Sequence, residues 1–363
     1  MDGSEPNFSE LSNNNHFSVY SKDLGRVLGK LRRSYKSADV LKSLRQLKEL
    51  KVLVVGDAIV DRYVYSVALG RPSKAMTLAV KSVASEDFAG GAIAAANHLA
   101  GFCGEVGFVT CLGKKESLED FIRSKLKENV KPIFFHRDDA TTIIKKRYVT
   151  QSHLQKLFEE YVFNDEPIGD KLTKKIAEKL EKIAPKYDLV LVLDYGHGFL
   201  NKRLISVLAK KARFLAANAQ TNSANTGFNL ITKYKDVDYA CIDEIEIRLA
   251  LSDRHSDIKS LAKRLSQTMG VDKVMVTMGH QGSLAYYEGK FFHCPPFSAK
   301  PVDPIGAGDA YIAITSPCVA TGMPMDLVSL IGNAAGAIAI KIVGNRSSVE
   351  PKKLFEAIAA VLK

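Results

Sequence analysis

A short glycine-rich run, Asp303-Pro304-Ile305-Gly306-Ala307-Gly308-Asp309, leads directly into an apolar stretch with helical character. Two glycines around a small residue leave consecutive backbone N–H groups uncovered, and at a helix start these groups point outward at the positive end of the dipole. Such a terminus binds anions, and a phosphoryl group is a suitable occupant. Asp309 falls in the first helical turn, beside this cradle. The run therefore predicts a helix that begins here and a site for phosphoryl transfer to a hydroxyl.

Two other interpretations of this run need weighing. Gly-Ala-Gly before a helix is often only a tight turn, and an aspartate in a first turn often only compensates the dipole. A dinucleotide fingerprint is disfavoured, because Tyr311 occupies the position of the third glycine and two prolines at 294–297 make the preceding segment a poor parallel strand. On these residues alone, a functional and a structural role both stay open.

Length and composition are those of an ordinary globular chain. Of 363 residues 46% are hydrophobic, enough for a sizeable core in one large or two medium domains. No apolar run reaches the roughly 18 residues of a membrane span, and the first residues lack the basic-then-apolar pattern of a secretory signal. The five cysteines are scattered without a Cys-x-x-Cys pair, which favours reduced thiols in a cytoplasmic protein over disulfides or a zinc site.

The formal net charge of +11 raises the question of nucleic-acid binding. The lysines of residues 171–182 interleave with acids and apolar residues, a pattern typical of a solvated helix face. No platform of aromatic and basic residues accompanies them. The sequence therefore favours a phosphorylated small molecule over nucleic acid as a partner.

The first 48 residues differ from the rest. Residues 1–16 are polar and rich in Asn and Ser, and we expect them to be disordered. Residues 20–48 carry spaced leucines and many basic residues, which predict one or two amphipathic helices. Residues 1–48 thus form a polar tail and a helical extension.

Residues 49–363 have the pattern of one α/β domain. Short apolar runs predict buried strands at 51–56, 187–194 and 272–277. Helical patterns lie between them, as at 171–184 and 256–269. This alternation predicts a doubly wound, mostly parallel sheet flanked by helices, with ligands at the carboxyl ends of its strands. Residues 62–88 and 131–163, richer in Tyr, Val, Thr and Phe with rough alternation, predict a small antiparallel sheet that acts as a lid.

Two motifs together resemble those of the ribokinase/PfkB carbohydrate kinase family: Gly90-Gly91-Ala92 before a helix, and the run 303–309. The resemblance extends from about Lys51 to the C-terminus and implies a ribokinase-like fold. Asp194-Tyr195-Gly196-x-Gly198 and the Lys145-x-Arg147 pair are most similar to the kinase part of bacterial D-glycero-D-manno-heptose 7-phosphate kinases, which are often fused to a nucleotidyltransferase.

The resemblance implies a catalytic role for the opening run. Asp309 is implied to be the general base that accepts the proton of the acceptor hydroxyl. The backbone of Gly306, Ala307 and Gly308 is implied to form the anion hole for the γ-phosphoryl group of ATP. A helix-end position is expected to keep Asp309 ionised and therefore a weak base, which suits a loose transition state.

The resemblance also implies a nucleotide and metal side. Asp243 and Glu246 match the family's Asn-x-x-Glu motif, with Asp243 in place of Asn, and are implied to hold Mg²⁺ through water; a charged helix start is the alternative. The implied nucleotide-binding residues are Asn218, Thr277, Gly279, Gly282 and Asn333. Close helix packing is the alternative role for the last of them.

On the acceptor side, the implied residues are Asp57, Asp61, Gly90, Gly91, Lys145 and Arg147. The carboxylates accept from vicinal sugar hydroxyls, and the glycines let the backbone approach the sugar. The basic pair meets a substrate phosphate from the lid, with arginine as a fork. Its alternative role is to protect an exposed strand edge with charge.

Three departures from the family pattern remove charge near the substrate or the triphosphate: Ala94 stands for an Asn, His197 for a Lys, and residues 218–220 for Asp-Pro-Lys. We expect His197 in a loop on the nucleotide side, without a metal role. These changes leave the acceptor open.

The predicted function is ATP-dependent phosphoryl transfer to a sugar or sugar phosphate, of the heptose 7-phosphate 1-kinase type. The alternatives are a kinase for another sugar or a nucleoside, and a non-catalytic kinase-like protein that binds a nucleotide. ATP and Mg²⁺ are the implied cofactors, and the family leaves a monovalent cation open. A homodimer through the lid is a candidate assembly. No His-x-Gly-His start of a nucleotidyltransferase is visible, so we expect any such activity on another chain.

Overall fold

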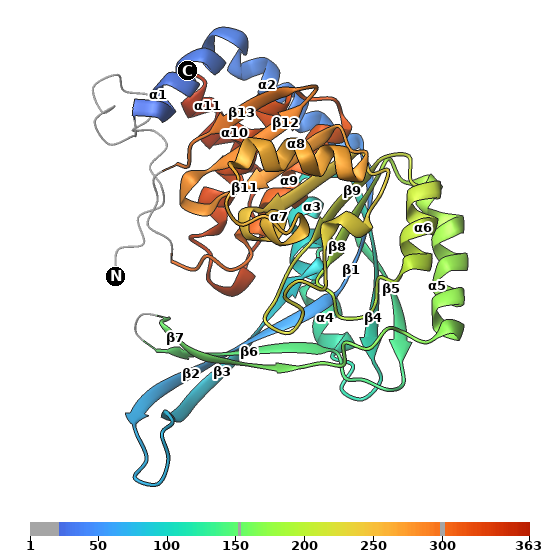
Figure 1. Ribbon diagram of the computed structural model, residues 1–363, viewed down its shortest axis with the longest axis vertical. Coiled ribbons are helices and arrows are strands. Elements are labelled where there is room, and N and C mark those ends of the chain that lie inside the picture. Colours follow the sequence, from blue (N-terminus) through green and yellow to red (C-terminus); the bar gives the residue numbers. More distant parts are fainter. Residues whose placement is uncertain (1–21, 152–153, 298–301) are drawn as a thin grey trace.

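The computed structural model describes residues 22–151, 154–297 and 302–363. A large sheet with helices on both faces forms the body, and a small sheet projects from it (Figure 1). The disorder expected for residues 1–16 lies outside the described residues. None of the described helices is long and apolar enough to cross a membrane.

The large sheet confirms the predicted doubly wound fold. Its strands are β1 (Lys51–Gly56), β4 (Glu105–Gly113), β5 (Val130–Arg137), β8 (Leu189–Asp194), β9 (Leu215–Ala219), β10 (Tyr239–Asp243), β11 (Lys273–Thr277), β12 (Ser283–Tyr287) and β13 (Lys290–Cys294). Their spatial order is β13-β12-β11-β10-β9-β8-β1-β4-β5. All neighbours from β11 to β5 are parallel, and β12 and β13 add an antiparallel edge.

Helices cover both faces of this sheet. They are α3 (Ala92–Phe102), α4 (Glu119–Lys125), α5 (Asp170–Ile183), α6 (Lys202–Lys211), α7 (Glu244–Ala250), α8 (Ile258–Met269), α9 (Ala307–Ala320), α10 (Met325–Ala339) and α11 (Pro351–Val361). Val54 of β1 faces the core shared with α3, α9 and α10, whereas Val55 faces the core shared with α5, α6 and α8. Burial on both faces explains why β1 and β8 are continuous apolar runs.

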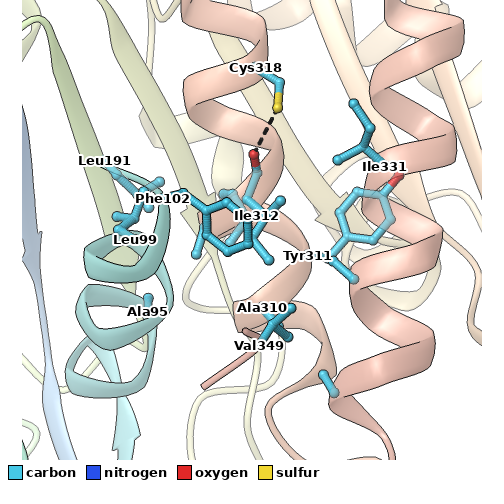
Figure 2. Packing of buried hydrophobic residues seen from close by; sticks show 14 of the residues in the cluster. Ala95, Leu99, Phe102, Leu191, Ala310, Tyr311, Ile312, Cys318, Ile331 and Val349 are labelled. Carbon is cyan, nitrogen blue, oxygen red and sulfur yellow. Dashed lines mark hydrogen bonds between the residues drawn. The ribbon is translucent and has the colours of Figure 1, made fainter. Parts of the chain in front are cut away.

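Helix α9 is apolar on nearly all sides because it is buried between α3 and α10. Leu99 and Phe102 of α3 pack near Ile312 of α9, with Leu191 of β8 beside them (Figure 2). This packing fixes the position at which α9 begins, at the carboxyl ends of the strands.

The small sheet consists of β2 (Ala58–Gly70), β3 (Ala79–Gly91), β6 (Ile143–Thr150) and β7 (Lys156–Val162), in the order β3-β2-β6-β7. Two details of its prediction were wrong. The central pair β2 and β6 is parallel, so the sheet is mixed. Residues 131–137 belong to β5, which pairs with β4 in the large sheet. As an edge strand that is only partly buried, β5 has the same mixed apolar and polar pattern as a lid strand.

The extension before β1 forms α1 (Lys22–Ser34), α2 (Ser37–Gln46) and the short turn η2 (Leu47–Glu49). Their leucines are buried except Leu41, which is half-buried, and Tyr35 donates a hydrogen bond of 2.8 Å to Asp326 of α10. The extension therefore packs on the C-terminal helices (Figure 1). None of the five cysteines, all of them within the described residues, forms a disulfide.

Candidate active site

Helix α9 begins at Ala307, as predicted, and Asp309 lies buried in its first turn. Asp309 Oδ1 accepts hydrogen bonds from Tyr195 Oη at 2.7 Å and Gln220 Nε2 at 2.8 Å. Both donors follow the carboxyl ends of parallel strands, β8 and β9. No described residue donates to Oδ2, so this oxygen is available to accept a further hydrogen bond.

Burial raises the pKa of Asp309 to about 6, against the lowering effect of the bonds from Tyr195 and Gln220. The expectation that Asp309 is a weak base was therefore wrong, because desolvation raises its pKa more than its position near the helix start lowers it. A pKa in this range suits the role of general base that is implied for Asp309.

The acid limb of the kcat/KM profile should accordingly lie near pH 6, because only the carboxylate form accepts a proton. Tyr195→Phe removes one bond that lowers the pKa of Asp309 and keeps the ring. We expect its acid limb to move to higher pH, measured as initial rates across that range. Superimposable limbs for the two proteins would rule out Asp309 as the titrating base.

Two other segments of the chain contact the glycine-rich run at the start of α9, the predicted anion cradle. Gly306, the N-cap of α9, has φ of 80°, and the side chain of Asn345 packs against its Cα. Asp303 Oδ2 accepts from Tyr63 Oη at 2.5 Å and from the Gly344 amide at 3.0 Å. These bonds tie the cradle to β2 of the small sheet and to the turn at Gly344 and Asn345.

A cavity of about 1090 Å³ opens in front of the cradle. The predicted residues that line it are Asn218, Asp243, Glu246, Thr277, Gly279, Gly282, Gly306, Ala307, Gly308, Asp309 and Asn333. All residues predicted for the nucleotide, the metal and the anion hole thus border one space. Asn333 also donates to the carbonyls of Cys294 and Pro295, at 2.8 and 3.0 Å, so it shapes the wall of this cavity besides packing in α10.

Asp243 and Glu246 form a capping box at the start of α7, which shows the alternative role proposed for them. Each oxygen of Glu246 accepts a backbone N–H, from Thr221 at 2.9 Å and Asp243 at 3.1 Å. Burial raises the pKa of Glu246 to about 7 and also raises that of Asp243. The described residues contain no cluster of three or more His, Cys, Asp or Glu that could hold a metal. Asp243 and Glu246, two desolvated carboxyl groups at the lining of this cavity, fit Mg²⁺, which keeps several waters and takes one or two protein carboxylates together with substrate phosphates.

The predicted acceptor residues lie apart from this cavity, around Asp57, Asp61 and the inner face of the small sheet. Asp57 Oδ2 accepts from the Tyr195 amide at 3.0 Å, and burial next to the charge of Asp194 raises its pKa to about 7. A Cβ at Gly90 would overlap the Asp61 carboxylate, so this glycine accommodates that side chain.

Lys145 and Arg147 sit on β6, an inner strand, and both are buried, which contradicts the alternative of an exposed edge. Arg147 forms ion pairs with Asp61 and, at 3.3 Å, with Glu159. Lys145 makes no ion pair with any described carboxylate. Its Nζ lies 5.7 Å from the centroid of the Tyr195 ring, and burial lowers its pKa. Of the two cations, Lys145 is therefore the one without a committed anion.

His197 does not border the nucleotide cavity, so its expected place was wrong. Its ring packs on Phe163 with centroids 4.7 Å apart, and burial and the charge of Lys145 lower its pKa to about 3. Neither ring nitrogen has a partner among the described residues. His197 thus lies near Lys145, one of the predicted acceptor residues.

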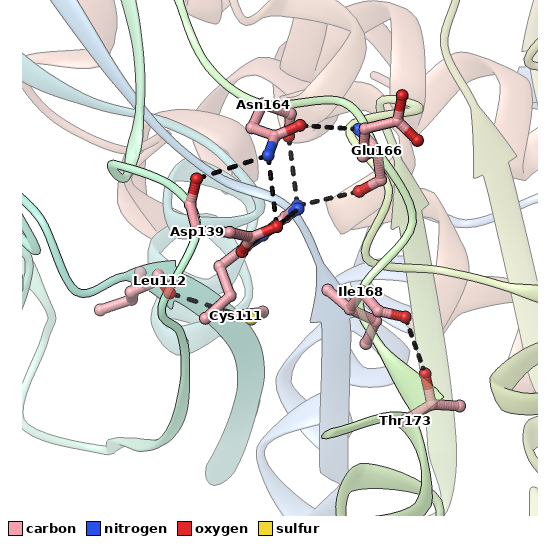
Figure 3. A network of polar contacts seen from close by, with 8 residues as sticks. Cys111, Leu112, Asp139, Asn164, Glu166, Ile168 and Thr173 are labelled. Carbon is pink, nitrogen blue, oxygen red and sulfur yellow. Dashed lines mark hydrogen bonds and ion pairs between the residues drawn. The ribbon is translucent and has the colours of Figure 1, made fainter. Parts of the chain in front are cut away.

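A polar network supports the loop that follows β8. Arg137 donates to Asp139 and to the carbonyls of Asn164 and Glu166, at 3.2 and 3.0 Å (Figure 3). The Ile168 amide then donates 3.0 Å to the carbonyl of Gly198. This segment therefore backs residues 195–198, the loop of Tyr195 and His197.

Tyr195 and Gln220, the two partners of Asp309, are the site residues that sequence reasoning missed. In the sequence Tyr195 stands out only as part of a motif, and Gln220 only as part of a departure from one. Their signal was their place directly after predicted or buried strands, β8 and β9.

The glycine-rich start of α9, the buried carboxylate in its first turn and the separate group of charged residues around the small sheet suit a kinase that phosphorylates a hydroxyl. The chain matches the pfkB family of carbohydrate kinases over residues 49–353 and belongs to this family. It is therefore a sugar kinase, and its family uses ATP, generally with Mg²⁺.

Relatives of known sequence include bifunctional HldE proteins. That of Vibrio atlanticus is 28% identical over 313 residues, which cover 85% of this chain and 63% of the relative. That of Syntrophotalea carbinolica is 28% identical over 332 residues, covering 87% and 64%. The chain thus spans less than two thirds of the length of these relatives.

Solved structures confirm a ribokinase-like fold. The ribokinase of Thermotoga maritima superimposes with a TM-score of 0.65 at 18% identity, covering 84% of this chain and 98% of the ribokinase. Phosphofructokinase-2 of Escherichia coli, in complex with substrates and products, gives 0.68 at 14% identity, covering 87% and 100%.

Proposed function

We propose that the protein transfers the γ-phosphoryl group of ATP to a hydroxyl of a sugar or sugar phosphate, with Asp309 as the base. The observation that supports this most is the position of Asp309. It borders the nucleotide cavity, and through Tyr195 it also adjoins Lys145 on the acceptor side. One carboxylate thus faces both reactants.

In the proposed mechanism the acceptor hydroxyl donates its hydrogen bond to Asp309 Oδ2. The hydroxyl oxygen forms a bond to the γ-phosphorus while the bond from that phosphorus to the β,γ-bridging oxygen breaks. The hydroxyl proton passes to Asp309, and ADP leaves with the bridging oxygen. Tyr195 and Gln220 hold the carboxylate in place, and the N–H groups of the α9 start stabilise charge on the transferring group.

Mg²⁺ would be held through water by Asp243 and Glu246, and would supply charge neutralisation at the β- and γ-phosphates. Asn218 supports the same wall of the cavity, since its Nδ2 donates to the Cys241 carbonyl at 2.9 Å. A monovalent cation stays a prediction, as does the cytoplasmic location.

For the acceptor we propose a heptose 7-phosphate, phosphorylated at its anomeric hydroxyl. The similarity to the kinase-length part of HldE proteins supports this choice. Another sugar or a nucleoside is the alternative, supported by the altered residues Ala94, His197 and Asn218. An ATP-consumption screen over free sugars, sugar phosphates, heptose phosphates and nucleosides tests both. A silent panel would favour a non-catalytic protein and contradict the proposal.

Lys145→Ala should raise KM for a phosphorylated acceptor about tenfold or more, because a charge-assisted bond to phosphate is lost. Its effect on unphosphorylated sugars should be small. Lys146→Ala is the matched control, since the neighbouring Lys146 pairs with Glu160 at 2.7 Å. Equal KM changes for both kinds of acceptor would show that Lys145 does not bind the phosphate of the acceptor.

We also propose a homodimer through the small sheet. The hairpin of β2 and β3 exposes large apolar side chains, namely Val67, Leu69, Met76, Leu78 and Val83. A nucleotidyltransferase on a separate chain is a further proposed partner, supported only by the bifunctional relatives. Sedimentation of the full chain, alone and with Leu69→Lys, tests the dimer; a monomer at all concentrations would contradict it.

A further inference from the structure

A second, smaller cavity lies beside α3, outside the active site. Its volume is about 140 Å³, and it is bounded by residues 86–89 of β3, by α3, by the turn at 125–127 and by residues 345–348. Ala94, one of the altered positions, borders it, but none of the residues assigned above to bind the nucleotide, the metal or the acceptor does. Its lining includes side-chain hydrogen-bond donors that have no acceptor among the described residues.

His98 gives the first unpaired donor. It is 1% exposed, and its Nδ1 accepts from the Val349 amide at 3.0 Å. Burial and the nearby charge of Lys127 lower its pKa to about 3, so the ring is neutral and its single proton resides on Nε2. No described residue accepts a hydrogen bond from Nε2. This N–H belongs to a residue that lines the cavity and is therefore free to donate to a bound ligand.

The side-chain amide of Asn345 gives the second unpaired donor. Its Nδ2 is buried and has no partner among the described residues. A Cβ at Gly306 would overlap Asn345 Oδ1, so this side chain lies between the small cavity and the anion cradle. A ligand that accepts from Nδ2 would hold the amide in this orientation.

The charges at the cavity favour an anion. Lys125 and Lys127 form no ion pair with the described carboxylates. Burial and the charge of Lys48 lower the pKa of Lys127, against the weaker opposite effect of Glu350. The two acids of the lining are already paired, Glu86 with Arg346 at 2.6 Å and Asp87 with Arg62 at 2.7 Å. Donors and positive charge are thus uncommitted, whereas the negative charges are neutralised.

We propose that this cavity binds a small oxyanion, such as phosphate or the phosphate group of a small metabolite. An oxyanion accepts from His98 Nε2 and from the buried Asn345 Nδ2 and neutralises Lys127, which gives both donors an acceptor. The cavity is too small for a nucleotide, which has the larger space in front of α9. The proposal does not depend on the identity of the acceptor or on the proposed reaction.

The test must separate this site from the anion cradle, which also binds phosphate. The full chain is saturated with a non-hydrolysable ATP analogue, and its Tm is followed as phosphate replaces chloride at constant ionic strength. We expect a saturable rise in Tm, because the ligand binds the native state. Lys127→Met should weaken phosphate binding about tenfold or more. Lys131→Met, which removes an exposed lysine paired with Glu105, should leave it unchanged.

If Lys127→Met does not fold, the exposed Lys125→Met replaces it with the same expected direction. The proposal is overturned if phosphate has no effect beyond chloride once the analogue is bound. It is equally overturned if Lys127→Met and Lys131→Met bind phosphate alike. The readout is binding, so a failure of the proposed kinase reaction leaves the outcome interpretable.

Discussion

Asp309→Asn is expected to lower turnover by about 10²-fold or more while ATP binding is largely retained. The amide keeps an oxygen for Tyr195 and Gln220 but takes up no proton. The backbone N–H groups at the start of α9 are untouched, so the anion cradle persists. Steady-state kinetics give kcat, and titration with a non-hydrolysable ATP analogue gives the affinity.

The stability of Asp309→Asn shows whether its turnover is lost because the base is missing or because the protein is unfolded. Burial raises the pKa of Asp309 from 3.8 to about 6, so the folded state binds its proton more tightly than the unfolded state. The carboxylate therefore destabilises the native protein progressively as the pH rises from about 4 to 6 and fully above it. At neutral pH Asp309→Asn should unfold no more easily than the wild type.

Asp326→Asn is the matched control, because it changes a carboxylate that accepts from Tyr35 and lies outside the nucleotide cavity. Its turnover should be close to that of the wild type. Near-normal turnover in Asp309→Asn, or an equal loss in Asp326→Asn, would remove Asp309 from the role of base.

The parts of the fold that local pattern determines were predictable. Strands β1 and β8 are buried on both faces, so they are uniformly apolar and end at a polar loop. The start of α9 was also predictable, since glycines and a helical apolar stretch adjoin in the sequence. The edge strand β5 was not, because partial burial gives it the pattern of a strand in the small sheet.

The contacts that tune the site are long-range, and no local pattern encodes them. Tyr195 and Gln220 reach Asp309 across 114 and 89 residues, through the parallel order of the strands. Arg147 forms an ion pair with Asp61 because β6 lies beside β2. Of the two basic residues predicted to bind a substrate phosphate, only Lys145 is therefore without an ion pair. The pKa of Asp309 is raised by the burial of its side chain. The direction of this pKa shift therefore could not be derived from the position of Asp309 near a helix start.

Gly306→Ala is expected to abolish measurable turnover or reduce it by about 10²-fold or more, the loss typical when charge stabilisation at an oxyanion is removed. Gly306 has φ of 80°, where a side chain costs about 1–2 kcal/mol. The new Cβ would also overlap Asn345, which packs directly behind the cradle. The start of α9 must then shift, and the N–H groups no longer converge on the γ-phosphoryl group. Turnover and nucleotide-analogue affinity should fall together.

Gly322→Ala separates backbone strain from this clash. Gly322 has φ of 79°, almost that of Gly306, but no described atom lies within 4 Å of its added Cβ. It should lose similar stability from strain, measured by denaturant unfolding, and keep its turnover. Gly306→Ala paired with Asn345→Ala then isolates the contact, because the smaller side chain makes room for the new methyl group. If the pair recovers turnover, the overlap rather than the strained backbone displaces the cradle; equal turnover in the two single glycine variants would show that the position of Gly306 is not critical for transfer.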